Sequence, residues 1–181
     1  MNRYILNLVL LFLFVGCGNA EQARSDKPNQ MLEKEQTQRA NFELEFPVKP
    51  EITSEVLPIQ GQPTNLTTKV ATVEDGMYLL FELDLGKLTD QVKKDQTGFF
   101  NGMLSYLISD LGAQYDNLTD YEYNGSKGNN FDIISPNKDE KRTAKGKTLL
   151  VDNKAYIWFG VSNDQDSLER VNKFINSFKL N

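Results

Sequence analysis

Reactive side chains are scarce in this chain of 181 residues, which contains no histidine and a single cysteine, Cys17. Ser–His–Asp and Cys–His catalysis both need an imidazole base, so these mechanisms are excluded, as are zinc sites with histidine ligands. Any chemistry must therefore come from carboxylates, lysine, tyrosine or serine, or from the one thiol.

Cys17 stands at the end of a tripartite N-terminal segment. Met1–Tyr4 carries one positive charge, Ile5–Val15 is almost wholly apolar, and Gly16 directly precedes the cysteine. A basic start, an apolar core of roughly 7–15 residues and a small residue before a cleavage site are typical of a secretory signal peptide. The apolar core is also shorter than the about 20 residues that a membrane-spanning helix needs.

The tetrapeptide Phe14-Val15-Gly16-Cys17 resembles the lipobox of bacterial lipoproteins, although leucine is the usual residue at the position of Phe14. This resemblance implies that Cys17 receives a diacylglycerol on its thiol and that the signal peptide, residues 1–16, is removed. Several acyl chains on one cysteine anchor a protein stably, whereas one chain binds only marginally. In some Gram-negative lipoproteins an aspartate after the cysteine favours the inner membrane. The residue here is Gly18, so we expect lipid anchoring in the cell envelope, with the outer membrane favoured over the inner.

Residues 17–40 are predicted to be the lipidated cysteine and a flexible linker, and residues 41–181 a single domain. Apart from Thr37, Gly18–Ala40 has no aromatic or β-branched residue and cannot bury enough apolar surface to order itself. Flexible-chain scaling gives this linker a reach of about 25 Å. The following stretch of about 140 residues suffices for one hydrophobic core, and with Cys17 acylated it has no thiol for a disulfide.

The charge balance and two short motifs restrict the partners. Removal of the signal peptide deletes Arg3, so the formal net charge changes from -5 to -6, which argues against nucleic acid. Gly146-Lys147-Thr148 matches only the end of a phosphate-binding loop, because Lys141 stands where its first glycine belongs. Asn163–Glu169 lacks the glycine of a calcium loop. No nucleotide, cofactor or metal is predicted, and the expected partners are the membrane, through Cys17, and another envelope protein.

The hydropathy pattern predicts an α+β fold with an antiparallel β-sheet packed by two main helices, at about 97–111 and 167–178. The first helix begins near Thr97 or near Thr89. Predicted strands alternate with turn signals, of which Asp75-Gly76 and Asp152-Asn153 are the clearest. The expected strands are 42–46, 52–57, 66–73, 77–85, 118–123, 130–134, 147–151 and 155–161, with a loop at 60–65.

The opening "NFELEFPVKPE" and the closing "VNKFINSFKL" resemble a class of small bacterial exported domains that have the fold of PsbP, the extrinsic subunit of photosystem II. This resemblance implies an αβα sandwich with the antiparallel sheet between helices. It carries no catalytic motif, so it implies a fold and no activity.

Acidic and aromatic side chains alternate in "YDNLTDYEYNG" and suggest two kinds of site. Asp120 and Glu122, with Asp116 nearby, could act as the paired carboxylates of a glycosidase. Tyr115, Tyr121 and Tyr123 are the candidate ligand or partner surface, whereas Trp158 is expected in the core.

No catalytic residue is assigned, because an alternating strand is also the common way to build a solvated face. The leading hypothesis is a non-enzymatic binding or accessory module of the envelope. The alternatives are a carboxylate-based hydrolase acting on envelope glycans and a carrier of small apolar ligands, with a cavity between the sheet and the helix at 97–111.

Overall fold

The computed structural model describes residues 42–109, 114–134, 143–162 and 165–180. Cys17, the predicted signal peptide at 1–16 and the predicted linker at 17–40 lie outside the described residues. The strands are β1 (Phe42–Glu43), β2 (Glu51–Ile59), β3 (Gln62–Val73), β4 (Gly76–Asp84), β5 (Gln114–Tyr123), β6 (Ser126–Ile134), β7 (Thr143–Val151), β8 (Lys154–Ser162) and β9 (Lys179–Leu180). The helices are the 3-10 turn η1 (Gly86–Leu88), α2 (Thr89–Lys94), α3 (Gln96–Ser109) and α4 (Gln165–Asn176).

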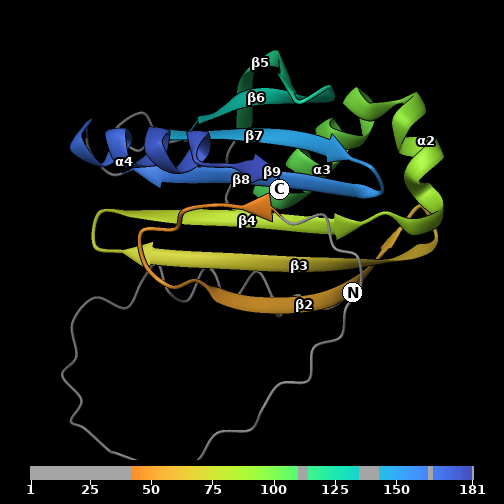
Figure 1. Ribbon diagram of the computed structural model, residues 1–181, viewed down its shortest axis with the longest axis horizontal. Coiled ribbons are helices and arrows are strands. Elements are labelled where there is room, and N and C mark those ends of the chain that lie inside the picture. The colour runs from red at the N-terminus through yellow and green to blue at the C-terminus, as the bar shows by residue number, and fades with distance from the viewer. Residues whose placement is uncertain (1–41, 110–113, 135–142, 163–164, 181) are drawn as a thin grey trace, which may run out of the picture. The chain divides into compact units, whose positions relative to one another are not determined.

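Seven strands form one antiparallel sheet in the order β2-β3-β4-β8-β7-β6-β5. β2 to β4 form one meander and β5 to β8 a second, and the two meanders join where β4 pairs with β8 (Figure 1). The connection from β4 to β5 carries η1, α2 and α3. β1 and β9 make a separate two-stranded sheet, in which Phe42 pairs with Leu180.

The centre of the sheet is apolar on both faces. Every residue of β8 from Ala155 to Gly160 is buried, and so are Met77–Phe81 of β4 beside it. Both alternating sets of side chains in "AYIWFGV" are apolar, as expected of a strand that is covered on both faces. The two-residue turn before β8 is also confirmed, with Asp152 at a φ of 52°.

The helical connection breaks at Asp95. Its backbone leaves the helical region at φ -137° and ψ 65° and ends α2. Its carboxylate then accepts a hydrogen bond of 3.0 Å from the Gly98 backbone N–H and caps the start of α3. The two starting points that the sequence left open for this helix, Thr97 and Thr89, therefore correspond to two separate helices.

The edge formed by β5 and β6 curls toward α4. The rings of Tyr121 and Tyr123 reach Trp158 and Phe178, with centroid distances of 6.3 and 5.8 Å. Trp158 belongs to β8, three strands away from β5 in the sheet order, so a flat sheet could not bring it to Tyr121. Gly128, which pairs with Tyr121, approaches β7 so closely that a Cβ would meet the carbonyl oxygen of Thr148.

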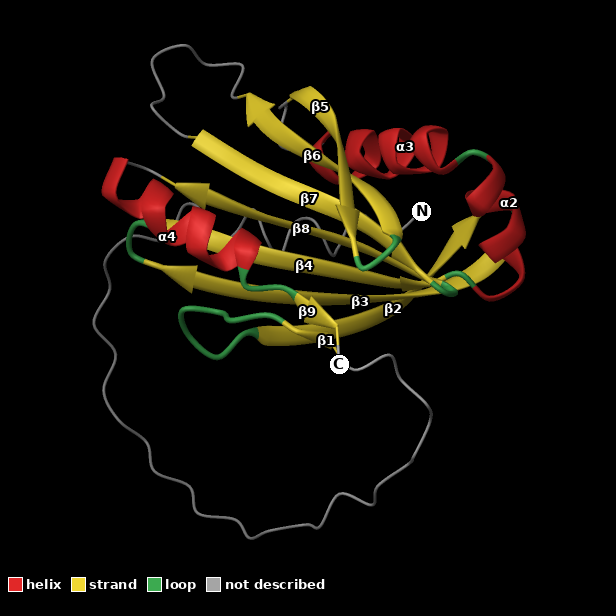
Figure 2. Ribbon diagram, turned by 45° about the horizontal axis from the view of Figure 1, so that its top comes forward, coloured by secondary structure: helices red, strands yellow, loops and turns green. Residues whose placement is uncertain are grey.

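α4 packs on the inside of this curl, against β8, β7 and β4 (Figure 2). Its buried stripe and the residues just after it are apolar: Val171, Phe174, Ile175 and Phe178. Gly160 of β8 allows the close approach, because a Cβ there would lie 2.9 Å from both methyl groups of Val171.

The predicted fold class was wrong. The structure is mostly β, and its described helices span only 6, 14 and 12 residues, so it is not an αβα sandwich with two packed helical layers, as the resemblance to PsbP implied. α4 covers only part of its face, and β1, β9 and the curled β5 cover the rest. The predicted loop at 60–65 was also wrong, because the chain makes a tight turn at Gln60-Gly61, with φ of 49° and 77°, and β3 begins at Gln62.

Candidate partner-binding groove

Residues 42–50, which we call the strap, cross the face of the sheet that α4 covers in part. Phe42 packs edge-on to Tyr156, with centroids 4.9 Å apart, and stacks on Phe178 at 5.8 Å. Phe46 packs on Phe174 at 5.1 Å. The apolar residues of the predicted "FELEF" strand thus bury their side chains against the end of α4 and the residues that follow it.

Ser177 fixes the strap through two hydrogen bonds. Its hydroxyl accepts a bond of 3.0 Å from the Glu45 backbone N–H and donates one of 2.7 Å to the Phe174 carbonyl. The Ser177 side chain therefore satisfies a backbone donor of the strap and a backbone acceptor in the last turn of α4 at the same time. The pairing of Phe42 and Glu43 with β9 holds the beginning of the strap.

Replacing Ser177 by alanine is expected to lower the free energy of unfolding by about 1 kcal/mol, because the Glu45 N–H loses its acceptor. Urea unfolding would measure this change, and amide hydrogen exchange should become faster at Glu45. The control is Ser54→Ala, because Ser54 is exposed and its only described bond, to Thr67, is long at 3.3 Å. Equal effects of the two substitutions would contradict this role of Ser177.

A surface groove of about 590 Å³ lies between the strap and the sheet, within the size range of small-molecule sites. Its lining combines strap residues with two side chains from the sheet, Ile52 of β2 and Lys69 of β3. The Lys69 Nζ lies 4.9 Å from the centroid of the Phe42 ring. Ile52 is 61% exposed and Val48 46% exposed, so the groove has an apolar rim. Lys49, Lys69 and Glu43 add charged groups to its lining.

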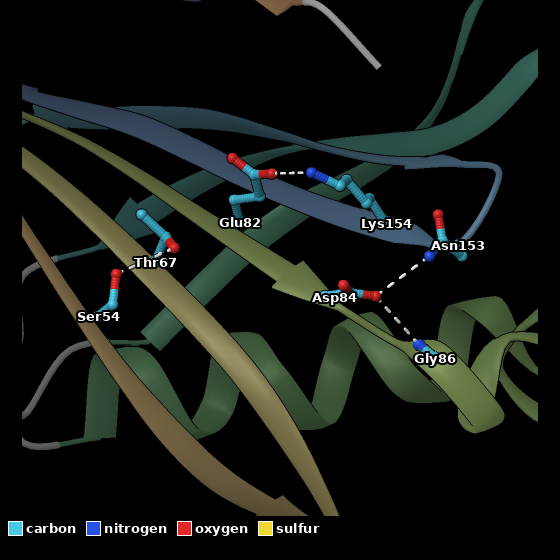
Figure 3. A network of polar contacts seen from close by, with 7 residues as sticks. All are labelled: Ser54, Thr67, Glu82, Asp84, Gly86, Asn153 and Lys154. Carbon is cyan, nitrogen blue, oxygen red and sulfur yellow. Dashed lines mark hydrogen bonds and ion pairs between the residues drawn. The ribbon is translucent and has the colours of Figure 1, made fainter. Parts of the chain in front are cut away.

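A network of polar contacts fixes the strands beyond the groove (Figure 3). The carboxylate of Asp84 accepts hydrogen bonds from the Asn153 side chain at 3.1 Å and the Gly86 backbone N–H at 3.3 Å. Lys154 forms an ion pair with Glu82. These contacts tie the end of β4 to the turn between β7 and β8, so the groove rests on a sheet that is braced across its central strands.

Two of the three predicted surface tyrosines belong to the aromatic cluster under α4. Trp158, which the sequence placed in the core, is fully buried, stacks on Phe178 at 4.6 Å and donates a hydrogen bond of 3.0 Å to the Ile175 carbonyl. Tyr121 and Tyr123 are half-buried against these two rings. Each can present only part of its ring to a partner.

Tyr121 also has a charged neighbour. The Lys147 Nζ lies 4.4 Å from the centroid of the Tyr121 ring and donates a hydrogen bond of 2.8 Å to Asn176. Burial lowers the pKa of Lys147. Burial, and secondarily the neighbouring Tyr123, raises the pKa of Tyr121, so its hydroxyl stays protonated well above neutral pH.

A β-bulge separates Tyr115 from the other two tyrosines. Asp116 pairs with Asp132, but Thr119 pairs with Asn130, so β5 holds one extra residue at this point. Because side chains alternate between faces, one extra residue turns Tyr115 to the face opposite Tyr121. The three tyrosines therefore do not form one surface.

The candidate carboxylates lie at the outer edge of the sheet. Asp116, Asp120 and Glu122 are all exposed, and Asp120 and Glu122 pair with Asn129 and Lys127 of β6. These two acids share one face of β5, as the spacing predicted. The groove between strap and sheet is lined by other residues, so it does not bring these carboxylates to an enclosed site.

Two buried tyrosine hydroxyls on the strap side of the sheet, those of Tyr78 and Tyr156, have no hydrogen-bond partner among the described residues. Burial raises the pKa of both phenols, and Glu82 and Asp152 add to the effect at Tyr156. The groove itself is not predictable from local sequence patterns, because Ile52 and Lys69 look like ordinary strand residues. The available signal was "FPVKP", in which two prolines break the strand and turn the chain back across the sheet.

Within the described ranges, no group of three or more histidine, cysteine, aspartate or glutamate residues is placed to hold a metal ion. None of the helices in that part of the chain is both long and apolar enough to cross a bilayer. Neither the models of known protein families nor the curated proteins contain a match to this chain.

Proposed function

We propose that this chain is a lipid-anchored, non-enzymatic binding module of the cell envelope, tethered through Cys17 and engaging another envelope protein at the groove between the strap and β2. The observation that carries the binding role is the apolar rim of this groove. Ile52, at 61% exposed, lies on a strand whose outer side pairs with no described strand. Exposed apolar patches with polar borders mark interaction sites more often than chance exposure.

The lipobox-like tetrapeptide and the linker support the envelope part of this proposal. A diacylated cysteine would hold the chain at the membrane, and a linker with a reach of about 25 Å would let the domain meet a partner beside the bilayer. With Gly18 after the cysteine, the outer membrane is the proposed location.

Site-specific photocrosslinking in native membranes tests the binding role. A photoreactive phenylalanine derivative at Ile52 of the full chain should give one defined adduct. The matched control is the same probe at Tyr106 of α3, which is 58% exposed and far from the groove residues in sequence; it should give no such adduct. Identical adduct patterns at both positions would contradict a specific site at the groove.

The hydrolase hypothesis makes a different prediction. Turnover of an envelope glycan by the purified chain, lost in Asp120→Asn or Glu122→Gln, would replace the proposed binding role with an enzymatic one.

A further inference from the structure

The two edges of the seven-stranded sheet differ in their ability to accept another strand. The β5 edge is interrupted by the bulge between Asp116 and Thr119, where Asn117 has a φ of 52°. β2 at the other edge pairs with β3 in one unbroken register, from Glu51 opposite Val70 to Ile59 opposite Gln62. Bulges protect an edge from pairing, and a straight edge with free backbone groups is a template for an added strand.

Prolines set the length of the open edge. Pro50 directly precedes β2, and Pro58, the next to last residue of the strand, has no N–H to donate. The stretch with a complete set of backbone donors is therefore Glu51–Leu57. This length suits a short extended segment, and the flanking prolines oppose the growth of a longer sheet.

The two faces of this edge have different chemistry. Ile52 and Val56, 61% and 59% exposed, lie on the groove side, four residues apart. Glu51 and Glu55 lie on the other side with the same spacing, because alternate residues of a strand point to opposite faces. Two lysines and one glutamate, Lys49, Lys69 and Glu43, line the groove, so the apolar side carries a net positive charge and disfavours a basic group.

The acidic face lacks counterions. Among the described residues neither Glu51 nor Glu55 has an ion pair. Glu55 pairs with the buried Leu66 and is itself half-buried. Burial raises the pKa of Glu55, which means that its carboxylate is held in partly desolvated surroundings with no cation beside it. A basic side chain on an incoming strand would supply that cation.

We propose that β2 binds a short extended segment of a partner protein, paired antiparallel along Glu51–Leu57, with apolar side chains toward the groove and basic side chains toward Glu51 and Glu55. This inference rests on the proposed function and specifies which side chains the partner segment should carry. In antiparallel pairing the segment meets Val56, Glu55, Ile52 and Glu51 in that order. Its pattern is therefore apolar-basic-x-x-apolar-basic.

This pattern can be tested by measuring the binding of a synthetic peptide to the full chain, solubilised in detergent. The peptide Thr-Val-Lys-Thr-Thr-Val-Lys-Thr should bind, as followed by fluorescence anisotropy, and should slow hydrogen exchange in the segment 51–57. The same peptide with glutamate for both lysines should bind about tenfold more weakly, because two cross-strand pairs change from attraction to repulsion. The substitution Glu55→Lys in the protein should reduce or reverse the difference in affinity between the two peptides. The control substitution Glu122→Lys, on the β5 edge, should leave this difference unchanged.

The outcomes separate this inference from the proposed function. If neither peptide binds while the Ile52 probe still gives its adduct in membranes, the strand-addition inference is wrong and the binding role stands. If both peptides bind equally, the basic pattern is wrong. If the chain forms dimers that depend on Val56 and exclude the peptide, the occupant of the edge is a second copy and the inference is overturned. Loss of both the adduct and peptide binding would reject the two proposals together.

Discussion

Replacing Cys17 by serine is expected to abolish lipid labelling of the chain and its retention in membranes. Serine keeps the size and polarity of the side chain, but its hydroxyl is not a thiol and cannot form the thioether to diacylglycerol. Two or more acyl chains give an effectively permanent anchor, at about 0.8 kcal/mol for each buried CH₂ group, so their loss changes the partition between membrane and solution completely. Metabolic labelling with a radioactive fatty acid and membrane fractionation in high salt would measure both effects.

An uncleaved signal peptide could itself hold the Cys17→Ser chain at the membrane, so a second chain is needed. This chain carries residues 18–181 behind a signal peptide that a different signal peptidase removes. We expect it to be exported, unlabelled and recovered in the soluble fraction. If it stays with the membrane in high salt, an attachment other than Cys17 holds the protein.

Replacing Trp158 by alanine is expected to lower the free energy of unfolding by about 3–5 kcal/mol, the range for a large aromatic side chain lost from a core. Trp158 is fully buried, stacks on Phe178 at 4.6 Å with an interplanar angle of 16°, and bonds to the Ile175 carbonyl. Its removal leaves a cavity in the core and takes the hydrogen-bond donor away from the Ile175 carbonyl. The Tyr121 ring also loses the indole against which it packs. For a domain of this size the melting temperature should fall by about 10–15 °C.

Calorimetry or thermal denaturation followed by circular dichroism would measure this loss. The control is Ile52→Ala, because Ile52 is an equally apolar residue at an exposed position; it should change the stability by less than about 0.5 kcal/mol. Comparable losses in the two variants would show that the aromatic cluster is not the centre of stability. The control also establishes that Ile52 can be altered for the binding experiments without unfolding the domain.

The features that the sequence predicted correctly are local. The turn at Asp152-Asn153 is specified by these two residues, of which Asp152 has a positive φ. The two hairpins, β3–β4 around Asp75 and β7–β8 around Asp152, follow from the alternation of apolar side chains in their strands. The buried stripe of α4, with Val171, Phe174 and Ile175, follows from spacing alone, although the helix ends at Asn176 and not at 178 as predicted. In each case the signal lies within about a dozen residues, which is the range over which periodicity and turn propensity act.

The features that the sequence did not predict depend on contacts between distant segments. The pairing of β4 with β8 joins residues such as Leu80 and Trp158, and no local pattern specifies it. The bulge between Asp116 and Thr119 inserts one residue into β5, so Tyr115 and Tyr121 lie on opposite faces of the sheet, which no local pattern predicts. The fold class failed for the same reason, since the curled edge and the strap, rather than helices, complete one face of the sheet.

The candidate groove shows the same limit. Its lining comes from the strap, from Ile52 and from Lys69, and only the return of the strap over the sheet brings Phe42 above Lys69. The exposed side chain of Ile52 follows an ordinary strand pattern, so its significance comes from the position of β2 at the edge of the sheet, where no described strand pairs with its outer side.

The pairing of Phe42 with Leu180 has a consequence for folding. Phe42 and Leu180 stand at opposite ends of the range 42–180, so the strap can be held only when both of these segments are in place. The seven-stranded sheet does not include this pair, because its order runs from β2 to β5 through the two meanders. Since β9 follows every strand of that sheet in the chain, the two meanders can pair before the strap closes, and we expect closure of the groove to be a late step in folding.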